Sequence, residues 1–263
     1  MGVLNGTPDS FYPKSRIPND YEVDYKSFKY CDILDIGFES SRPYAAPVSE
    51  YDELKRLDNF IERFNFQNIR LSIDTYKPAV AIKALENGFN IVNDIKSGGE
   101  TGEMFEIASS FNANIVLMHM NGTPMTMQDN IANTNILEEL LNYFDDKISL
   151  ALKLGMDESK IIIDPGLGFG KSMNDNYNII NNLSMLKAFN LPLLLGLSRK
   201  SFLSVGEDSS ENRLPASLGA AALAINNGAN ILRVHDIEET YRMVSIIDRI
   251  LNQKIERISI NEA

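Results

Sequence analysis

Short apolar runs alternate with longer amphipathic segments along the chain, and eight such pairs can be counted. The short runs are almost continuous Ile, Leu and Val, which is typical of parallel strands covered on both faces. The predicted strands are Gly2–Asn5, Asp32–Ile36, Arg70–Asp74, Asn90–Asn93, Asn114–His119, Lys160–Asp164, Leu193–Leu197 and Asn230–Val234. The predicted helices include Glu50–Phe64, Pro78–Asn87, Ile136–Leu154, Tyr177–Phe189, Pro215–Asn226 and Glu238–Ile255. Eight strand–helix pairs in 263 residues predict an α/β fold, a single (β/α)8 TIM barrel, which typically needs about 250 residues.

Local turn signals agree with these boundaries. Gly88, Gly155 and Gly228 each follow a helical run, where a left-handed residue commonly ends a helix. Ser49 precedes the first long helix and is a candidate N-cap. An open doubly wound sheet is the alternative architecture, but no GxGxxG or GxxxxGK[ST] motif opens the first helix. We therefore expect residues 1–263 to form one barrel domain.

Composition excludes several classes of function. A net charge of −11 and a pI near 4.7 disfavour nucleic acid as a partner, because a polyanion would be repelled from most of the surface. A single cysteine, Cys31, excludes an intramolecular disulfide and a multi-cysteine zinc site. No apolar stretch approaches the roughly 20 residues of a spanning helix, and the N-terminus lacks the layout of a signal peptide. We expect a cytoplasmic protein without a membrane partner.

Every predicted strand ends on polar or ionisable residues. In a TIM barrel these carboxyl ends meet at one face, where the active site lies. The residues are Asn5, Asp35 with Glu39, Asp74, Asn93 with Asp94, His119, Asp164, Ser198 with Arg199 and Lys200, and Arg233 with His235. Asp74, Asn93 and Asp164 offer acceptors for a ligand with N–H donors. Arg42, Arg199, Lys200 and Arg233 suit a phosphate or carboxylate, so the ring indicates an anionic small molecule.

Other motifs are less specific. The segment DPGLGFGK, residues 164–171, follows a strand and reads as a tight turn more readily than as a phosphate loop. Both histidines, His119 and His235, end strands, and a structural role and a functional role are equally open for them. The sequence has no HExxH or GxSxG motif, which disfavours zinc hydrolysis and serine acyl transfer.

Eight ordered segments resemble those of the dihydropteroate synthases, which are pterin-binding enzymes. They are MGVLNGTPDSF, DIGFESSRP, SIDTYKP, NDI, MHMNGTPMTMQ, DPGLGFGK, GLSRKSF and RVHD, and the resemblance runs from Met1 to about Asp236. It implies a Mg²⁺-dependent transferase of folate biosynthesis that is a target of sulfonamides. The enzyme would join 6-hydroxymethyl-7,8-dihydropterin diphosphate to p-aminobenzoate, with release of diphosphate. The resemblance also implies a homodimer formed through the late helices.

The resemblance implies a role for each site residue. The pterin site would comprise Asp74, Asn93, Met118, Asp164, Gly196, Lys200 and Arg233, and the diphosphate site Asn5, Arg42, Arg233 and His235. The p-aminobenzoate site would comprise Ser41, Pro43, Phe169, Lys200 and Ser201, with the carboxylate at a helix that begins after SRKS. Asp74, Asp164, Lys200, Arg233 and His235 would be the catalytic residues, and Asn5 would bind magnesium.

Two other functions use similar residues. A methyltransferase acting on methyltetrahydrofolate with a corrinoid partner would share the pterin acceptors, but it would not need Arg42, Arg233 and His235 to hold a diphosphate. A catalytically silent pterin-binding protein would not need Asn5. Diphosphate release assayed with all three components distinguishes these alternatives.

The chain departs from the family pattern in its first two loops. Gly6 replaces the usual valine, and the loop that follows reads FYPKSRI. The stretch from Phe11 to Asp35 is shorter than usual, so we expect an abbreviated first helix around Tyr21–Tyr30 and a first strand without an extension before it. In the second loop Phe38, Ser41 and Tyr44 replace Gly, Thr and Gly. These three positions are expected near p-aminobenzoate, which predicts altered sensitivity to sulfonamides.

Overall fold

The computed structural model describes residues 1–6, 28–40, 46–64, 69–122, 135–206 and 209–252. The strands in these residues are β1 (Gly2–Asn5), β2 (Ile33–Gly37), β3 (Arg70–Asp74), β4 (Ile91–Asp94), β5 (Asn114–Met118), β6 (Ile161–Asp164), β7 (Leu194–Gly196) and β8 (Ile231–Arg233). The helices are α1 (Glu50–Arg63), α2 (Pro78–Glu86), α3 (Glu103–Ser110), α4 (Ile136–Lys153), α5 (Met173–Asn181), α6 (Leu214–Asn227) and α7 (Ile237–Leu251). The strands therefore agree with the prediction to within one residue at each end.

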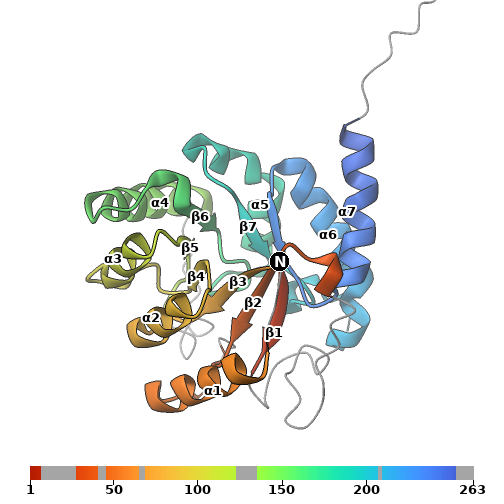
Figure 1. The fold of residues 1–263 in the computed structure, drawn as a ribbon. Helices are drawn as coiled ribbons and strands as arrows, with labels where there is room; N and C mark the ends of the chain where they lie inside the picture. The colour runs from red at the N-terminus through yellow and green to blue at the C-terminus, as the bar shows by residue number, and fades with distance from the viewer. Residues whose placement is uncertain (7–27, 41–45, 65–68, 123–134, 207–208, 253–263) are drawn as a thin grey trace, which may run out of the picture.

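All strand pairs are parallel, and the strands follow one another in chain order. Strands β1 to β6 form one sheet, and β7 pairs with β8. Isolated parallel bridges join Ile163 to Leu193 and Gly2 to Val234, so backbone contacts also link β6 to the segment before β7 and β8 to β1. Figure 1 shows the strands at the centre of the molecule with the helices around them. This is the arrangement of a (β/α)8 barrel.

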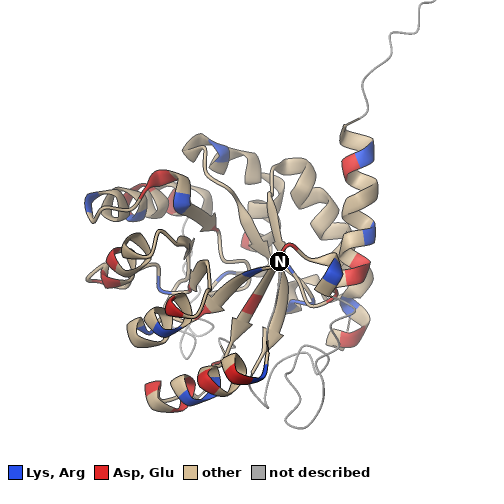
Figure 2. Ribbon diagram, in the orientation of Figure 1, with Lys and Arg blue, Asp and Glu red and all other residues tan. Residues whose placement is uncertain are grey.

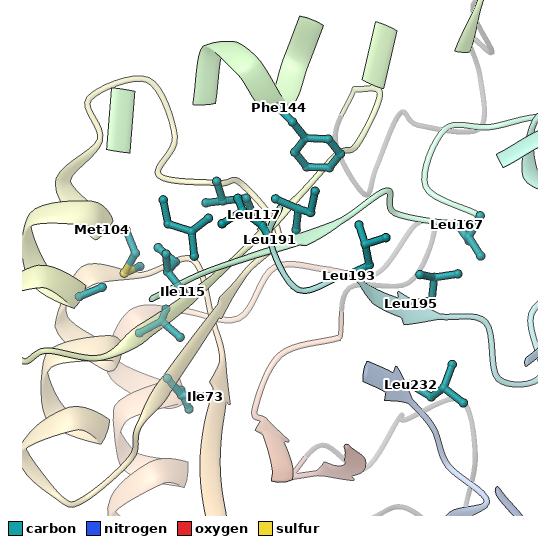
Figure 3. Packing of buried hydrophobic residues seen from close by; sticks show 14 of the residues in the cluster. Ile73, Met104, Ile115, Leu117, Phe144, Leu167, Leu191, Leu193, Leu195 and Leu232 are labelled. Atoms are coloured by element: carbon teal, nitrogen blue, oxygen red, sulfur yellow. The ribbon is translucent and has the colours of Figure 1, made fainter. Parts of the chain in front are cut away.

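Two apolar clusters form the core. The larger lies between strands and helices and includes Ile73, Ile115 and Leu117 of the strands and Phe144 of α4, as Figure 3 shows. The smaller comprises Ile33, Ile91, Val116, Ile162 and Leu194, which come from five different strands. Since neighbouring side chains in a strand point to opposite faces, the two clusters occupy the outside and the inside of the barrel wall.

One helix prediction was wrong. The segment expected to be one helix from Tyr177 to Phe189 is α5 followed by a 3₁₀ helix, Leu183–Phe189. Helix α5 begins earlier because Ser172 and Asp175 form a reciprocal capping box. It ends at Asn181, and both the backbone N–H and the side-chain amide of Asn182 donate to the carbonyl oxygen of Asn178, each at 3.0 Å.

Other local predictions are confirmed. The side chain of Ser49 accepts a hydrogen bond from the N–H of Asp52 at 3.1 Å and caps α1, and the three helix-ending glycines have positive φ. The expected first helix lies mostly outside the described residues, which contain a 3₁₀ turn at Phe28–Tyr30. Figure 2 shows that most charged residues lie on the outer helices. Among the helices described, none has the length and apolar character needed to cross a bilayer.

Candidate active site

Side chains alternate between the two faces of each strand, and this alternation places the predicted pterin residues on the inside of the barrel. Asn93 and Met118 each lie two positions after a residue of the inner apolar cluster, and residues two apart in a strand share a face. The same parity places Asp35, Asp74, Asn93, Met118, Asp164, Gly196 and Arg233 in one inner ring. Strand register puts Asp74 beside Asn93, Met118 beside Asp164 and Gly196 beside Arg233. Residues far apart in sequence thus become neighbours.

The carboxylate of Asp35 is fully buried and holds three side chains together. It accepts hydrogen bonds from Ser72 Oγ at 2.6 Å, Asn93 Nδ2 at 3.0 Å and Arg233 Nε at 2.6 Å. Because the amide nitrogen of Asn93 bonds to Asp35, its amide oxygen is the atom that can accept a hydrogen bond from a ligand. Asp35 therefore orients both Asn93 and Arg233.

Arg233 connects Asp35 to a second carboxylate. Its Nη2 donates to Asp74 Oδ2 at 2.6 Å. Burial, together with the charge of Asp35, raises the pKa of Asp74 to about 7, although Arg233 opposes this shift. Burial lowers the pKa of Arg233, but Asp35 and Asp74 outweigh it and raise the pKa above its ordinary value. At neutral pH Arg233 is charged, while Asp74 lies near the midpoint of its titration and can accept or donate a hydrogen bond.

Lys200 reaches the ring from the connection after β7. Its Nζ donates to the carbonyl oxygen of Leu167 and lies 4.4 Å from the centroid of the Phe169 ring. Burial lowers the pKa of Lys200 to about 8, and the carboxylate of Asp164 opposes that shift. A Cβ atom on Gly196 would lie 4.0 Å from the side chains of both Lys200 and Arg233, so the glycine leaves room beside both cations.

The glycine-rich segment after β6 is packed closely against the segment after β5. A Cβ on Gly166 would lie 2.0 Å from the carbonyl oxygen of His119, and one on Gly170 would lie 2.5 Å from that of Asn121. Lys171 ties the same segments together, because its Nζ donates to the carbonyl oxygens of His119 and Phe169, each at 3.1 Å. The glycines therefore allow close backbone packing, which agrees with a tight turn and places Phe169 beside Lys200.

His235 and Asn5 lie at the same ends of their strands as the ring. His235 follows Arg233 by two positions, and Ser198 Oγ lies 3.3 Å from its backbone nitrogen and 3.2 Å from Nδ1. Burial and the charge of Arg233 lower the pKa of His235 to about 4, so the imidazole is neutral at pH 7. Asn5 is the last residue of β1, and its register partner is Gly37.

Three residues expected at the ring face elsewhere. Asp94 directly follows the inward Asn93, and its carboxylate accepts hydrogen bonds from the backbone nitrogens of Lys96 at 2.8 Å and Gly98 at 2.7 Å. His119 directly follows Met118, so strand parity turns it outward, where Nε2 lies 3.1 Å from Glu139 Oε1 on α4. Arg199 forms a buried ion pair with Asp236 at 2.7 Å, and its Nη1 donates to two backbone carbonyl oxygens. All three side chains thus serve the packing of the fold, and the expectation that Arg199 faces a ligand anion is wrong.

Two expectations about the p-aminobenzoate region also need correction. Phe38 is 1% exposed and packs edge-to-face on Phe60, with ring centroids 5.8 Å apart, so it belongs to the core. The helix expected after SRKS is only a three-residue 3₁₀ turn, Ser201–Leu203, and α6 begins later, at Leu214. Ser201 is exposed at the start of this turn. Ser41, Arg42, Pro43 and Tyr44 lie outside the described residues.

Sequence reasoning did not assign a role to Asp35, Ser198 or Lys171. Asp35 shares the strand parity of Ile33 and could have been assigned from it. Ser198 contacts His235, 37 positions away, and Lys171 contacts the backbone of His119, 52 positions away. A local sequence pattern cannot predict contacts between residues so far apart.

The donor set limits how a metal could be held. Within the described ranges, no group of three or more His, Cys, Asp or Glu side chains could hold a metal ion. Mg²⁺ prefers oxygen ligands and commonly keeps several waters, binding through one or two protein groups plus substrate phosphates. A single side-chain oxygen at Asn5 is compatible with that mode of binding and not with an all-protein cage.

Comparisons with known proteins identify the family. The family model of pterin binding enzymes matches residues 1–235. The dihydropteroate synthase of Escherichia coli is 37% identical over 97% of this chain and 92% of that protein, and the Bacillus subtilis enzyme is 35% identical over 96% and 88%. The Yersinia pestis dihydropteroate synthase, solved with a sulfonamide drug complex, has a TM-score of 0.87 at 34% identity and covers 96% of this chain and 94% of its own.

A second solved structure covers a similar share of the chain. The Xanthomonas albilineans dihydropteroate synthase, solved with 4-aminobenzoic acid, has a TM-score of 0.84 at 30% identity and covers 97% of this chain and 93% of its own. Sequence identity and fold therefore agree over nearly the whole of each chain. The chain belongs to the pterin-binding enzyme family and, within it, to the dihydropteroate synthases.

Proposed function

We propose that this chain condenses 6-hydroxymethyl-7,8-dihydropterin diphosphate with p-aminobenzoate to give 7,8-dihydropteroate and diphosphate, a step of folate biosynthesis. The observation that carries the proposal is the inner ring, in which acceptors from β3, β4 and β6 lie beside the cations Arg233 and Lys200. A dihydropterin presents ring N–H and amino donors to such acceptors. The diphosphate it carries is an anion that suits the cations.

Each part of the ring has a task in this reaction. Asp74, Asn93 and Asp164 would accept hydrogen bonds from the pterin, and Met118 and Gly196 would line its face. Asn93 suits this task because its amide nitrogen already donates to Asp35. Asp74 suits it because its pKa of about 7 lets it share a proton with a ring nitrogen.

The leaving diphosphate would be held by charge. Arg233 and His235, with Arg42 and Asn5, would form its site, and stabilising charge that develops on a leaving group is a large catalytic term. Mg²⁺, bound at Asn5, would supply further neutralisation of that charge. No enzyme nucleophile is needed, because the substitution occurs at the exocyclic methylene carbon of the pterin and the amine of p-aminobenzoate is the nucleophile.

The amine would be positioned by the loops around Lys200. Lys200 and Phe169 stack at 4.4 Å, and with Ser41, Pro43 and Ser201 they would bound the p-aminobenzoate site. Positioning of two reactants next to each other is worth several kcal/mol, on the order of 7 to 11 in well-oriented systems. A single domain over residues 1–263, a homodimer and a cytoplasmic location are proposed together with the reaction, on the family resemblance.

The test is a turnover assay with purified protein. Diphosphate release is expected only when pterin diphosphate, p-aminobenzoate and Mg²⁺ are all present, and dihydropteroate should form in equal amount. Methyl transfer from methyltetrahydrofolate to a corrinoid, or pterin binding by calorimetry without turnover, would each overturn the proposal. Omission of one component at a time is the control.

A further inference from the structure

We infer that Ser198 is a positioning residue that sets the tautomer of His235, so that the neutral imidazole carries its proton on Nε2. The inference deepens the proposed function, since an Nε2–H group is the donor that a leaving diphosphate requires. Ser198 lies in the connection after β7 and His235 follows β8, so the pair spans two neighbouring strands.

The hydrogen bonds of Ser198 define the direction of each proton. Its Oγ lies 3.3 Å from the backbone nitrogen of His235 and 3.2 Å from Nδ1 of the same residue. The backbone N–H can only donate, so Oγ accepts from it. The hydroxyl proton is then directed to Nδ1, and a neutral imidazole whose Nδ1 accepts must carry its proton on Nε2.

The other neutral tautomer leaves a group unsatisfied. If Nδ1 carried the proton, Oγ would accept two hydrogen bonds and its own proton would have no acceptor. Ser198 is 6% exposed, and within the described part of the chain both of its side-chain hydrogen bonds go to His235. A buried donor without an acceptor is costly. Only the Nε2–H form satisfies the backbone amide, the hydroxyl and the ring nitrogen together.

Burial and nearby charges keep the ring neutral. Burial disfavours an imidazolium most, the charges of Arg233, Arg199 and Lys200 add to this effect, and Asp236 acts in the opposite direction. Asp236 is itself paired with Arg199, which weakens its attraction for a second cation. Burial acts in the same direction as the three cations, and together they lower the pKa to about 4. His235 therefore donates without first having to gain a proton from solvent.

The tautomer can be read directly by NMR of protein labelled with ¹⁵N-histidine. The chain contains only two histidines, and the variant His119→Gln assigns the remaining signals to His235. At pH 7.5 the unliganded wild-type protein should show a protonated Nε2 and an unprotonated Nδ1. Ser198→Ala should shift His235 toward a mixture of tautomers, and Ser198→Thr should restore the wild-type pattern.

Kinetics separate the positioning role from a structural one. Ser198→Ala should lower kcat about fivefold, the equivalent of one ordinary hydrogen bond, with little change in KM for p-aminobenzoate or in affinity for 6-hydroxymethylpterin, which has no diphosphate. Ser109→Ala is the matched control, because the hydroxyl of Ser109, in α3, donates to the carbonyl oxygen of Gly155, which follows α4, at 2.7 Å. This control should change neither the tautomer nor kcat.

Different results would refute the inference about His235 and the proposed reaction. A proton on Nδ1, or an imidazolium, in the wild-type protein at pH 7.5 overturns the inference whatever the turnover assay gives. An unchanged tautomer in folded Ser198→Ala protein overturns the role of Ser198. A protein with the Nε2–H form that makes no dihydropteroate supports the tautomer and refutes the proposed reaction alone.

Discussion

The substitution Asp35→Asn tests the role of Asp35 as the hub of the inner ring, that is, the residue that accepts three of its hydrogen bonds. It leaves the volume of the side chain almost unchanged. Three donors converge on the Asp35 carboxylate, from Ser72, Asn93 and Arg233. An asparagine there has one acceptor oxygen and an NH2 group that is itself a donor. Asn93 and Arg233 both donate to Oδ2 of Asp35, so an amide oxygen in that place can still accept from both, while the NH2 group faces Ser72 Oγ, which can accept. The substitution therefore removes the negative charge, and Arg233 loses one of its two carboxylate partners.

The expected cost follows from the burial of this ion pair. Removing one partner of a buried pair costs about 3 to 5 kcal/mol. Arg233 keeps its contact with Asp74, and its side chain is 22% exposed, so we expect a loss of about 2 to 4 kcal/mol in the free energy of unfolding. For a chain of 263 residues that corresponds to a fall in Tm of roughly 4 to 8 °C.

Urea unfolding monitored by circular dichroism measures this loss, with an unchanged slope m showing that the folded state is otherwise intact. Calorimetry should also show at least about tenfold weaker binding of 6-hydroxymethylpterin, since the charge that holds Arg233 in the ring is lost. Asp58→Asn is the matched control, because Asp58 pairs with Lys83 at the surface at 2.8 Å and should leave the midpoint unchanged. A loss below about 1 kcal/mol for Asp35→Asn would refute the role of Asp35 as the hub.

Three further outcomes test other parts of the structure. Asp74→Ala should lower kcat at least about 100-fold, by analogy with removal of a preorganised polar group, and a normal rate would remove Asp74 from the site. Gly166→Ala should destabilise the fold by about 2 to 4 kcal/mol in a urea titration, because its φ is 64° and a Cβ would lie 2.0 Å from the His119 carbonyl oxygen; an unchanged midpoint would contradict that packing. Burial lowers the pKa of Lys171 to about 7 from 10.5, so between these values the unfolded chain binds one proton more than the folded protein. The free energy of unfolding should therefore rise from pH 7 to pH 10, at about 1.4 kcal/mol per pH unit at most for this group. Lys171→Met should reduce that rise and leave the part that Lys200 contributes above pH 8, since burial lowers the pKa of Lys200 to about 8. An identical pH dependence in both proteins would show that Lys171 does not contribute.

Much of the barrel was predictable because its signals are local. Continuous Ile, Leu and Val runs specify buried parallel strands, and all eight strands were placed to within one residue. Helices α1, α2, α4, α6 and α7 were predicted from their periodicity, whereas α3 was not among the predicted helices. The bounds of α5 were also missed, since the capping box of Ser172 decides where it begins. Such side-chain to backbone bonds compete with periodicity and can override it.

The sequence alone determined the order of the strands, the acidic character of the chain and the set of polar residues that follow each strand, since these depend only on residue type and spacing. Only the tertiary structure decided which of those residues meet. His119 and His235 both follow strands, but they fall on opposite sides of the alternation. His119 points outward to Glu139, and His235 points inward beside Arg233. Asp35 orients Asn93, and Ser198 bonds to His235, because parallel strands bring distant residues into register. Those contacts depend on backbone positions that no short stretch of sequence specifies.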